Sequence, residues 1–246
     1  MIWVGCCGLP EGLEKYAKRF KVLEINSTFY KLPKLETAER WRKKVPEDFK
    51  FSVKCHQGVT HPIKSPTWRR SGLKPEELER LEGKVGFLRP TREVLNFWEK
   101  TMEICKVLGA EICLIQLPRS FKESEENLQN LKEFFSKAKR DELKIALELR
   151  GWDLEAFRRI CKELDLIQVT DPFLQMPSYI KDIVYFRLHG SYEKGRINYK
   201  HKYSEKELKE LKEKLEGLEA KDIYVMFNNV YMKEDALRFK ELIGTA

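Results

Sequence analysis

The chain has 246 residues, a length that fits one barrel domain of about 250 residues. Its net charge is +8, and its longest apolar runs fall well short of the roughly 20 residues that a membrane span needs. The first ten residues also lack the basic start of a secretory signal. These features exclude a membrane-spanning protein and predict a cytoplasmic one with no membrane partner.

Eight short apolar runs recur along the chain, each rich in β-branched or aromatic side chains. Such runs are typical of strands that are buried in a parallel sheet. In chain order, strands are predicted over residues 2–6, 22–26, 49–54, 112–117, 144–149, 166–170, 183–188 and 223–228.

Amphipathic, charged segments separate most of these runs. Asp153 and Ser204 are expected to be helix N-caps, and Ser204 with Glu207 has the spacing of a capping box. Residues 171–182 are too short and too broken by proline for a full helix. Helices are predicted over residues 11–19, 35–44, 92–108, 124–139, 153–163, 204–216 and 234–243.

This alternation, without a break in composition, favours a closed (β/α)8 barrel of the TIM type, regular or irregular, over an open doubly wound sheet. A GxGxxG motif does not follow the first strand, which argues against a dinucleotide-binding sheet. Residues 1–246 are therefore expected to form a single TIM-barrel domain. Residues 55–91 after the third strand and 189–203 after the seventh are long enough to be lids or binding loops.

Polar side chains recur at alternate positions where four predicted strands end. Because strand side chains alternate, Glu24 and Asn26 are expected to share one face of the second strand. The same spacing relates Lys54 to His56, Glu148 to Arg150, and Arg187 to His189. Further polar residues at strand ends are Gln116, Asp171, Asn228 and Asn229.

The pattern predicts a polar, cationic pocket at the C-terminal ends of the strands, where barrel enzymes keep their sites. Burying so many ionisable groups is costly unless they are paired or bind a ligand. The alternative is therefore a closed network of ion pairs that fills the barrel mouth and binds nothing.

Five segments carry a resemblance to a known family. They are VLEINSTFYKLPKLETAERWRKKVPEDFKFSVKCHQGVTH, ICLIQLPRSF, ALELRGWD, YFRLHGSY and YVMFNN, in this order. Together they resemble the YecE-like family, domain-of-unknown-function family 72, which implies a TIM-type barrel and no established activity. The resemblance points to Glu24, Asn26, Thr28, Phe29, Tyr30, Lys54, His61, Gln116, Glu148, Arg150, Arg187, His189, Asn228 and Asn229. The chain departs from the family at residues 6–9 (CCGL) and at Gly151.

The first functional hypothesis is a hydrolase of the phosphoesterase or nuclease type that acts on an anionic, phosphate-bearing substrate, either nucleic acid or sugar phosphate. Guanidinium and ammonium groups of Lys54, Arg150 and Arg187 would clamp the anion. The catalytic candidates are Glu24, Glu148, His56 and His189, because these groups can transfer protons. The substrate-binding candidates are Asn26, Phe29, Tyr30, Lys54, His61, Gln116, Arg150, Arg187, Asn228 and Asn229.

A divalent metal ion is an open alternative within this hypothesis. Its ligands would come from Glu24, Glu148, Asp171, His56 and His189. Neither HxH nor HExxH spacing occurs, and the neighbouring lysine and arginine side chains would repel a cation. A glycosidase is a further alternative in which Glu24 and Glu148 would flank a sugar.

The remaining hypothesis is a non-catalytic protein that binds nucleic acid or nucleotides. Residues 54–70 and 194–203 interleave basic side chains with Trp68, Tyr199 and Tyr203, as in sites for single strands. Solvated loops with aromatic anchors fit the same residues, and no protein partner can be inferred.

The six cysteines form no CxxC pair. Cys105, Cys113 and Cys161 lie in apolar stretches and are predicted to be small core residues. Cys6, Cys7 and Cys55 lie at predicted strand ends, which leaves a thiolate site or a disulfide open.

Overall fold

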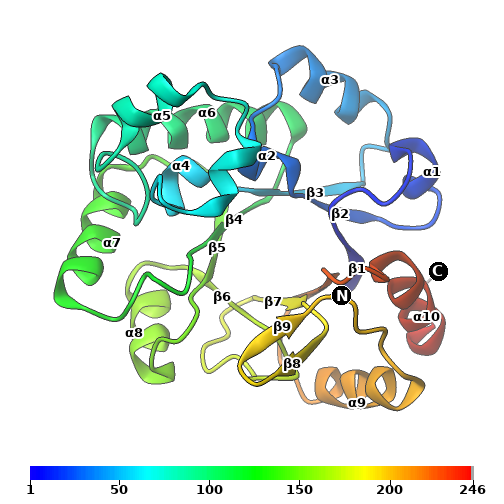
Figure 1. Cartoon of the computed structure of the whole chain (residues 1–246). Helices are drawn as coiled ribbons and strands as arrows, with labels where there is room; N and C mark the ends of the chain where they lie inside the picture. Colours follow the sequence, from blue (N-terminus) through cyan, green and yellow to red (C-terminus); the bar gives the residue numbers. More distant parts are fainter. Residues whose placement is uncertain (245–246) are drawn as a thin grey trace. The chain divides into compact units, whose positions relative to one another are not determined.

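Eight parallel strands, most of them separated by helices, form the frame of the computed structural model, which describes residues 1–244 (Figure 1). The strands are hydrogen-bonded in the order β1-β10-β7-β6-β5-β4-β3-β2, which closes into a barrel. Their bounds are β1 (Ile2–Cys7), β2 (Val22–Ile25), β3 (Lys50–Lys54), β4 (Ile112–Gln116), β5 (Lys144–Glu148), β6 (Ile167–Thr170), β7 (Ile183–Leu188) and β10 (Asp222–Phe227). The predicted TIM-type barrel and all eight predicted strands are confirmed.

The predicted helices are also present, with small differences at their ends. Ser204 Oγ accepts from the Glu207 N–H and Glu207 Oε2 accepts from the Ser204 N–H, so the capping box is confirmed. Asp153 caps the helix that follows it, and residues 171–182 contain no helix. The bounds are α1 (Leu13–Ala17), α3 (Leu35–Lys43), α6 (Arg92–Leu108), α7 (Glu125–Lys137), α8 (Leu154–Glu163), α9 (Glu205–Glu216) and α10 (Met232–Ile243).

The long connection after β3, which was predicted to be a lid or binding loop, is not an irregular loop. It contains three short helices, α4 (Gln57–Thr60), the 3-10 helix η1 (Pro66–Arg70) and α5 (Pro75–Leu81). Pro66 and Pro75 open η1 and α5, a position where the missing proline N–H costs nothing. A further short helix, α2 (Ser27–Tyr30), follows β2. Helices of one or two turns carry too few residues for their periodicity to be recognised.

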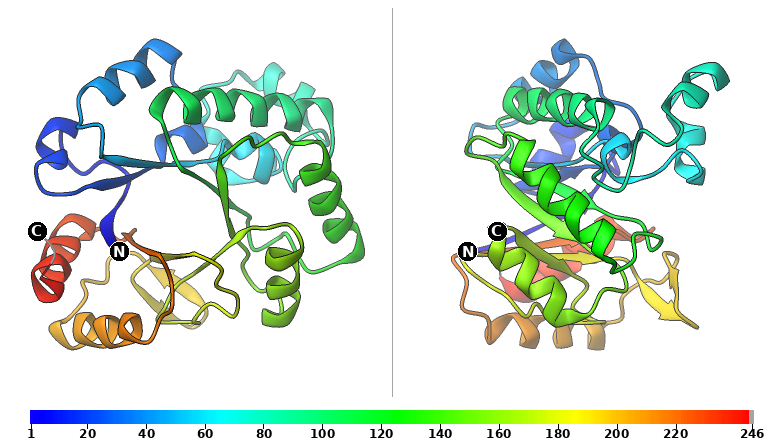
Figure 2. Two further views of the ribbon diagram at one scale, coloured as in Figure 1. Left: turned by 180° about the vertical axis from the view of Figure 1, so that it is seen from behind. Right: turned by 90° about the vertical axis from the view of Figure 1, so that its left-hand side faces the viewer.

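The connection after β7 folds into an antiparallel hairpin of β8 (Ser191–Glu193) and β9 (Arg196–Asn198). Lys194 and Gly195 form its two-residue loop with φ of 48° and 74°, the left-handed values that a type I′ turn requires. In the right-hand view of Figure 2 this hairpin, in yellow, stands out from α9, in orange.

The described chain forms two compact units. Unit 1 comprises residues 1–24, residues 44–50 and the described chain from residue 167 onward; unit 2 comprises residues 25–43 and 51–166. Unit 1 contains β1, β6, β7 and β10, whereas unit 2 contains β4, β5 and nearly all of β3. A single domain over residues 1–246 stays a prediction.

Large apolar side chains form the core of each unit. Every residue of β4 and of β7 is buried, as expected for strands that are covered on both faces. In unit 1 the rings of Tyr185 and Tyr224 stack with centroids 5.5 Å apart. In unit 2 Trp98 packs edge-on against Phe134, also at 5.5 Å.

All six cysteines are free and buried, so the disulfide alternative is wrong. Burial raises the pKa of the Cys6 thiol to about 12 and the pKa of the Cys7 thiol well above its usual value. Both thiols are therefore protonated at neutral pH, which argues against a thiolate site. Cys105, Cys113 and Cys161 are small core residues, as predicted.

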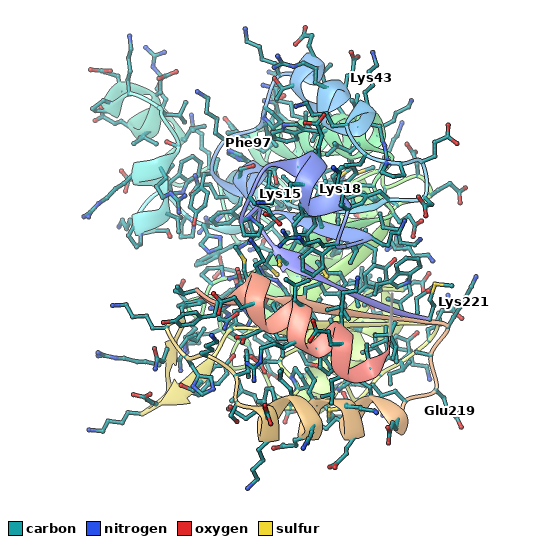
Figure 3. All side chains as sticks on the ribbon, turned by 90° about the vertical axis from the view of Figure 1, so that its right-hand side faces the viewer. Lys15, Lys18, Lys43, Phe97, Glu219 and Lys221 are labelled. Carbon is teal, nitrogen blue, oxygen red and sulfur yellow. The ribbon has the colours of Figure 1, made fainter. Side chains whose placement is uncertain are left out.

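Charged side chains cover the helix surfaces. Lys15 and Lys18 beside α1 and Lys43 at the end of α3 are exposed (Figure 3). On α9, Lys214 Nζ lies 3.2 Å from the Glu210 carboxylate one turn earlier. Charges of both signs thus alternate on solvated faces. Across residues 1–244, no helix is long and apolar enough to cross a bilayer.

Candidate functional site

Two clusters of polar side chains lie at strand ends, one in each unit. The Glu24 cluster in unit 1 consists of Glu24, Asp171, Tyr185, Arg187, His189 and Tyr192. The Lys54 cluster in unit 2 consists of Phe29, Lys54, His61, Gln116, Glu148 and Arg150. The Lys54 cluster comes from three neighbouring strands, from the segments that follow them and from α2, whereas the Glu24 cluster joins β2 to β6 and β7, which are not its neighbours in the barrel.

A fully buried ion pair anchors the Glu24 cluster. Arg187 Nε donates to Glu24 Oε2 at 3.1 Å, and Nη2 donates to Oε1 at 2.8 Å. The two side chains are 1% and 0% exposed, and the Tyr185 hydroxyl donates to Oε2 at 2.8 Å. The cost of burying the two charges is offset by this bidentate geometry and by the extra hydrogen bond.

His189 lies between Arg187 and Asp171. Arg187 Nη1 is 3.3 Å from His189 Nε2, while His189 Nδ1 is 3.4 Å from Asp171 Oδ2. Because a guanidinium only donates, Nε2 must accept and the proton of a neutral ring must be on Nδ1, facing the carboxylate. Asp171 Oδ2 also accepts from the His189 N–H at 3.1 Å and from the Tyr192 hydroxyl at 2.9 Å. The result is a buried carboxylate that lies beside a buried histidine ring at ion-pair distance.

Strand alternation explains how β7 supplies this cluster. Tyr185, Arg187 and His189 occupy alternate positions along and just beyond the strand, so their side chains share a face. Arg187 and His189 were predicted from this spacing, whereas Tyr185 was not, although it lies at the same spacing. Tyr192 was also missed, because its position depends on the β8–β9 hairpin.

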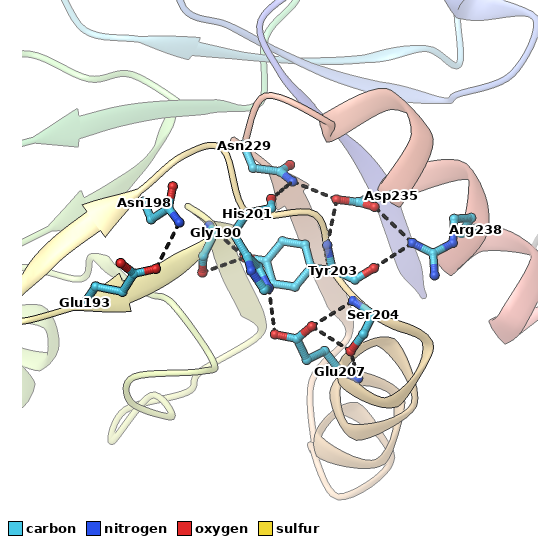
Figure 4. A network of polar contacts seen from close by, with 10 residues as sticks. All are labelled: Gly190, Glu193, Asn198, His201, Tyr203, Ser204, Glu207, Asn229, Asp235 and Arg238. Carbon is cyan, nitrogen blue, oxygen red and sulfur yellow. Dashed lines mark hydrogen bonds and ion pairs between the residues drawn. The ribbon is translucent and has the colours of Figure 1, made fainter.

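The two asparagines after β10 have different surroundings. The Asn228 side chain is partly exposed, and its backbone N–H donates to the Leu188 carbonyl. Asn229 is buried, and its Nδ2 donates to the His201 carbonyl and to Asp235 Oδ2 (Figure 4). Asn229 therefore ties the segment after the hairpin to α10.

Asp235 is the centre of the network in Figure 4. It accepts from the Tyr203 N–H and from Arg238 as well as from Asn229, and burial raises the pKa of its carboxyl. The Tyr203 hydroxyl accepts from the Gly190 N–H at 2.8 Å, directly after His189. This network fixes the turn that carries His189.

In unit 2, Lys54 at the end of β3 is held over an aromatic ring. Its Nζ donates to Gln116 Oε1 at 2.7 Å and lies 4.3 Å from the centroid of Phe29. The strand register places Gln116 beside Glu148 on β5. Three neighbouring strands thus bring Lys54, Gln116 and Glu148 together in one cluster.

Arg150 completes the charge pattern of the Lys54 cluster. Its Nε and Nη2 lie 2.9 and 2.8 Å from Glu148 Oε1, so both donors meet one carboxylate oxygen. The Glu148 side chain is buried, whereas Arg150 is 24% exposed and reaches solvent.

His61 is neutral in this environment. Burial, followed by the positive charges of Lys54 and Arg150, lowers the pKa of His61 to about 3. Both cations affect the ring more strongly than Glu148 does. Its Nδ1 lies 2.7 Å from Thr60 Oγ1, and its ring meets Phe29 edge-on at 4.9 Å. The ring therefore experiences a net positive field.

His56 does not continue the alternation of β3. The strand ends at Lys54, and His56 is the N-cap of α4, where its Nδ1 accepts from the Gly58 N–H at 3.0 Å. A hydrogen bond to the Tyr30 backbone engages the ring as well, and the ring stacks on Phe97 at 4.4 Å. Burial lowers the pKa of His56 to about 4. Its contacts are those of a structural side chain.

Asn26 likewise lies beyond the strand alternation, at the N-cap of α2. Its Oδ1 is buried and accepts no hydrogen bond within residues 1–244. Thr28 joins α2 to β3 by donating to the Lys54 carbonyl at 2.7 Å. Tyr30 is partly exposed and carries the Arg70 guanidinium at 3.7 Å over its ring.

Two of the aromatic side chains that were considered for base stacking are unsuited to it. Trp68 is buried and donates to the His61 carbonyl, and Tyr203 is buried in the network of Figure 4. Both are anchors of their loops, whereas Tyr199 is 42% exposed.

Metal ligands are not grouped in either unit. Within residues 1–244, histidine, cysteine, aspartate and glutamate side chains form no group of three or more that could hold a metal ion. Such a group is what the divalent-metal alternative requires.

Comparisons with known proteins agree on one family. The sequence profile of the family described as "Protein of unknown function DUF72" matches residues 5–245. The UPF0759 protein YunF of Bacillus subtilis is 24% identical over 247 residues, which cover 88% of this chain and 80% of YunF.

Two solved structures of DUF72 family proteins share the fold. The protein from Enterococcus faecalis superposes with a TM-score of 0.73 at 24% identity, covering 100% of this chain and 98% of its own. The protein from Thermotoga maritima gives a TM-score of 0.69 at 25% identity, with 99% of each chain covered.

Proposed function

Since the chain belongs to the DUF72 family, whose description states no activity, we propose from its own residues that it is a hydrolase acting on an anionic, phosphate-bearing substrate. The observation that carries this proposal is the electrostatic character of the Lys54 cluster. Two cations, Lys54 and Arg150, accompany a single carboxylate, Glu148, in this cluster, so its charged groups carry a net positive charge that would stabilise a bound anion.

The binding groups have the chemistry that a phosphate needs. Lys54 supplies an ammonium charge held by neutral Gln116, and the partly exposed Arg150 supplies guanidinium donors. Neutral His61 adds a hydrogen-bonding ring that stays uncharged across the physiological range. Phe29 closes one side of the cluster as an apolar wall.

His189, in the Glu24 cluster of unit 1, is proposed as a proton-transfer residue on the basis of its own surroundings. Asp171 Oδ2 lies 3.4 Å from its Nδ1 and would stabilise the charged ring after proton uptake. Arg187 donates to its Nε2 and is held in turn by Glu24, which makes Arg187 and Glu24 positioning residues rather than anion ligands.

Release of inorganic phosphate or of a free alcohol from a panel of phosphate mono- and diesters tests the proposal. His189→Gln is expected to lower kcat by about 100-fold or more, the usual contribution of a general acid or base. Lys54→Met keeps the alkyl stem over Phe29 but loses the charge, so it is expected to raise KM. Lys43→Met removes an exposed lysine charge outside both clusters and serves as the control.

Wild-type protein that hydrolyses no ester above the uncatalysed rate would contradict the proposal. A rate that does not change in His189→Gln would show that another group transfers the proton.

A second candidate is a non-catalytic protein that binds nucleic acid, and the β8–β9 hairpin favours it. The exposed residues of the hairpin and the following segment include Lys194, Arg196, Tyr199, Lys200 and Lys202. Basic groups can follow a phosphate backbone while a tyrosine ring stacks on a base. Affinity for a single-stranded oligonucleotide that falls steeply with salt, without hydrolysis, would support this candidate over the first.

A further inference from the structure

A pocket of about 710 Å³ lies in unit 2. Its lining consists of residues 62–66, residues 118–120, and Glu82, Gly83, Phe87 and Arg89. Its volume lies within the range of about 300–1,000 Å³ that is typical of small-molecule sites. Pro62, Ile63, Pro66, Phe87 and Pro118 give it apolar walls, so it fits a flat or rigid apolar group.

The charged residues at this pocket are predominantly basic. Lys64, Arg89 and Arg119 line it together with one acid, Glu82, which lies 4.0 Å from Lys64. Arg89 also lies over the Phe87 ring, at 5.3 Å from its centroid. An apolar occupant that carries negative charge matches this combination better than a neutral or cationic one.

Two chain segments connect the pocket directly to the Lys54 cluster. His61 of the cluster is followed at once by Pro62 of the pocket, and Gln116 lies two residues before Pro118. The walls of the pocket and two residues of the Lys54 cluster are therefore carried by the same two segments.

The segment that carries Phe87 is fixed against the same region. The Phe87 N–H donates to the Thr60 carbonyl at 3.1 Å, and the Gly86 N–H donates to the Gly58 carbonyl at 2.8 Å. Gly86 packs so closely that a Cβ there would lie 2.3 Å from Pro62 N. The backbone that carries Phe87 is therefore held against the segment that contains His61.

We infer that this pocket binds the planar aromatic or heteroaromatic group of a phosphate ester whose phosphate is held by the Lys54 cluster. The inference rests on the proposed function and deepens it, because it selects aryl and nucleoside phosphates over sugar phosphates as the substrate class. Free nucleotides and single-stranded nucleic acid both contain a planar base together with a phosphate.

Isothermal titration with phenyl phosphate and ethyl phosphate isolates the contribution of the ring. Wild-type protein is expected to bind phenyl phosphate about tenfold more tightly, since burying a ring contributes on the order of one to a few kcal/mol. In Phe87→Ala this ratio is expected to fall toward one. Ser120→Trp, at an exposed position of the rim, should fill the pocket and lower the ratio without touching the core.

Ser136→Trp adds the same ring at an exposed position of α7 outside this pocket and is expected to keep the wild-type ratio. Equal affinities of wild-type protein for the two esters would overturn this inference while leaving the proposed function intact. Saturable binding of neither ester would overturn both.

Uridine 5′-monophosphate and a uridine tetranucleotide distinguish the two sources of the ligand. Tighter binding of the monophosphate than of ribose 5-phosphate supports the inference. A further gain for the tetranucleotide identifies nucleic acid as the source, and equal binding of uridine 5′-monophosphate and ribose 5-phosphate counts against a ring subsite.

Discussion

Arg187 binds both carboxylate oxygens of Glu24, at 3.1 and 2.8 Å, while neither side chain reaches solvent. The pair joins β2 to β7 within unit 1 and leaves the third guanidinium nitrogen, Nη1, facing His189. The position of the proposed proton-transfer residue therefore depends on an ion pair that does not itself need to touch a substrate.

Glu24→Gln leaves the Arg187 charge buried without its counter-charge. We expect the free energy of unfolding to fall by about 3–5 kcal/mol, as in other cases where one partner of a buried pair is removed. Urea denaturation measures the change. Glu14→Gln is the control, because the Glu14 side chain is 67% exposed and its contact with Lys44 is a surface pair worth less than about 1 kcal/mol. Similar losses of unfolding free energy in the two variants would show that burial of the Glu24–Arg187 pair does not increase the cost of removing its carboxylate.

The tautomer of His189 is a direct consequence of the contacts around it. With Arg187 donating to Nε2 and Asp171 facing Nδ1, the neutral ring is expected to carry its proton on Nδ1. Long-range ¹⁵N–¹H spectra at pH 8 identify the protonated nitrogen. Asp171→Ala should weaken this preference, whereas a ring protonated on Nε2 in the wild-type protein would contradict the arrangement.

His61 and His56 make stability depend on pH. Burial lowers the pKa of His61 to about 3 and the pKa of His56 to about 4, from a usual value of 6.5. Because the folded pKa is depressed, the unfolded chain takes up protons first, and stability present above pH 6.5 is lost as the pH falls.

Each of these two histidines is expected to lower the free energy of unfolding by about 2 kcal/mol between pH 7 and pH 5. Urea denaturation at both pH values measures the loss, and His61→Asn should reduce it by the share of one histidine. An unchanged pH dependence in that variant would show that His61 is not held neutral by the fold.

Gly86→Ala tests the close approach beside the apolar pocket. The added Cβ would lie 2.3 Å from Pro62 N, at a residue with φ of 82°. Gly83→Ala is the matched control, since Gly83 has φ of 75° and open space around the same position. Both variants bear the cost of left-handed backbone, of order 1 kcal/mol, and Gly86→Ala should lose at least about 1 kcal/mol more. Equal losses in thermal unfolding would contradict the close packing.

The barrel could be predicted because buried parallel strands leave strong apolar runs between charged helices. Arg187 and His189 could be predicted as a pair because side chains alternate along a strand, which places these two residues on one face of β7. The same reasoning failed at His56 and Asn26, because β3 and β2 end before these residues and short helices redirect their side chains.

Other features depend on contacts between distant segments. The bond from Tyr192 to Asp171 requires the hairpin turn at Lys194 and Gly195, and local patterning does not reveal that such a turn brings the tyrosine back to β6. Asn229 was predicted to bind substrate on the basis of its strand end alone, whereas the contacts of its amide lie in the network around Asp235. Its role in binding stays a prediction.

Isothermal titration calorimetry with inorganic phosphate tests most directly the central claim, that the Lys54 cluster binds phosphate. If the Lys54 cluster binds phosphate, wild-type protein and Lys43→Met should bind it with equal affinity, and Lys54→Met should bind it about tenfold or more weakly, since a charged hydrogen bond is worth about 1.5–3 kcal/mol. The same affinity in all three proteins, or no saturable binding by the wild type, would contradict the claim.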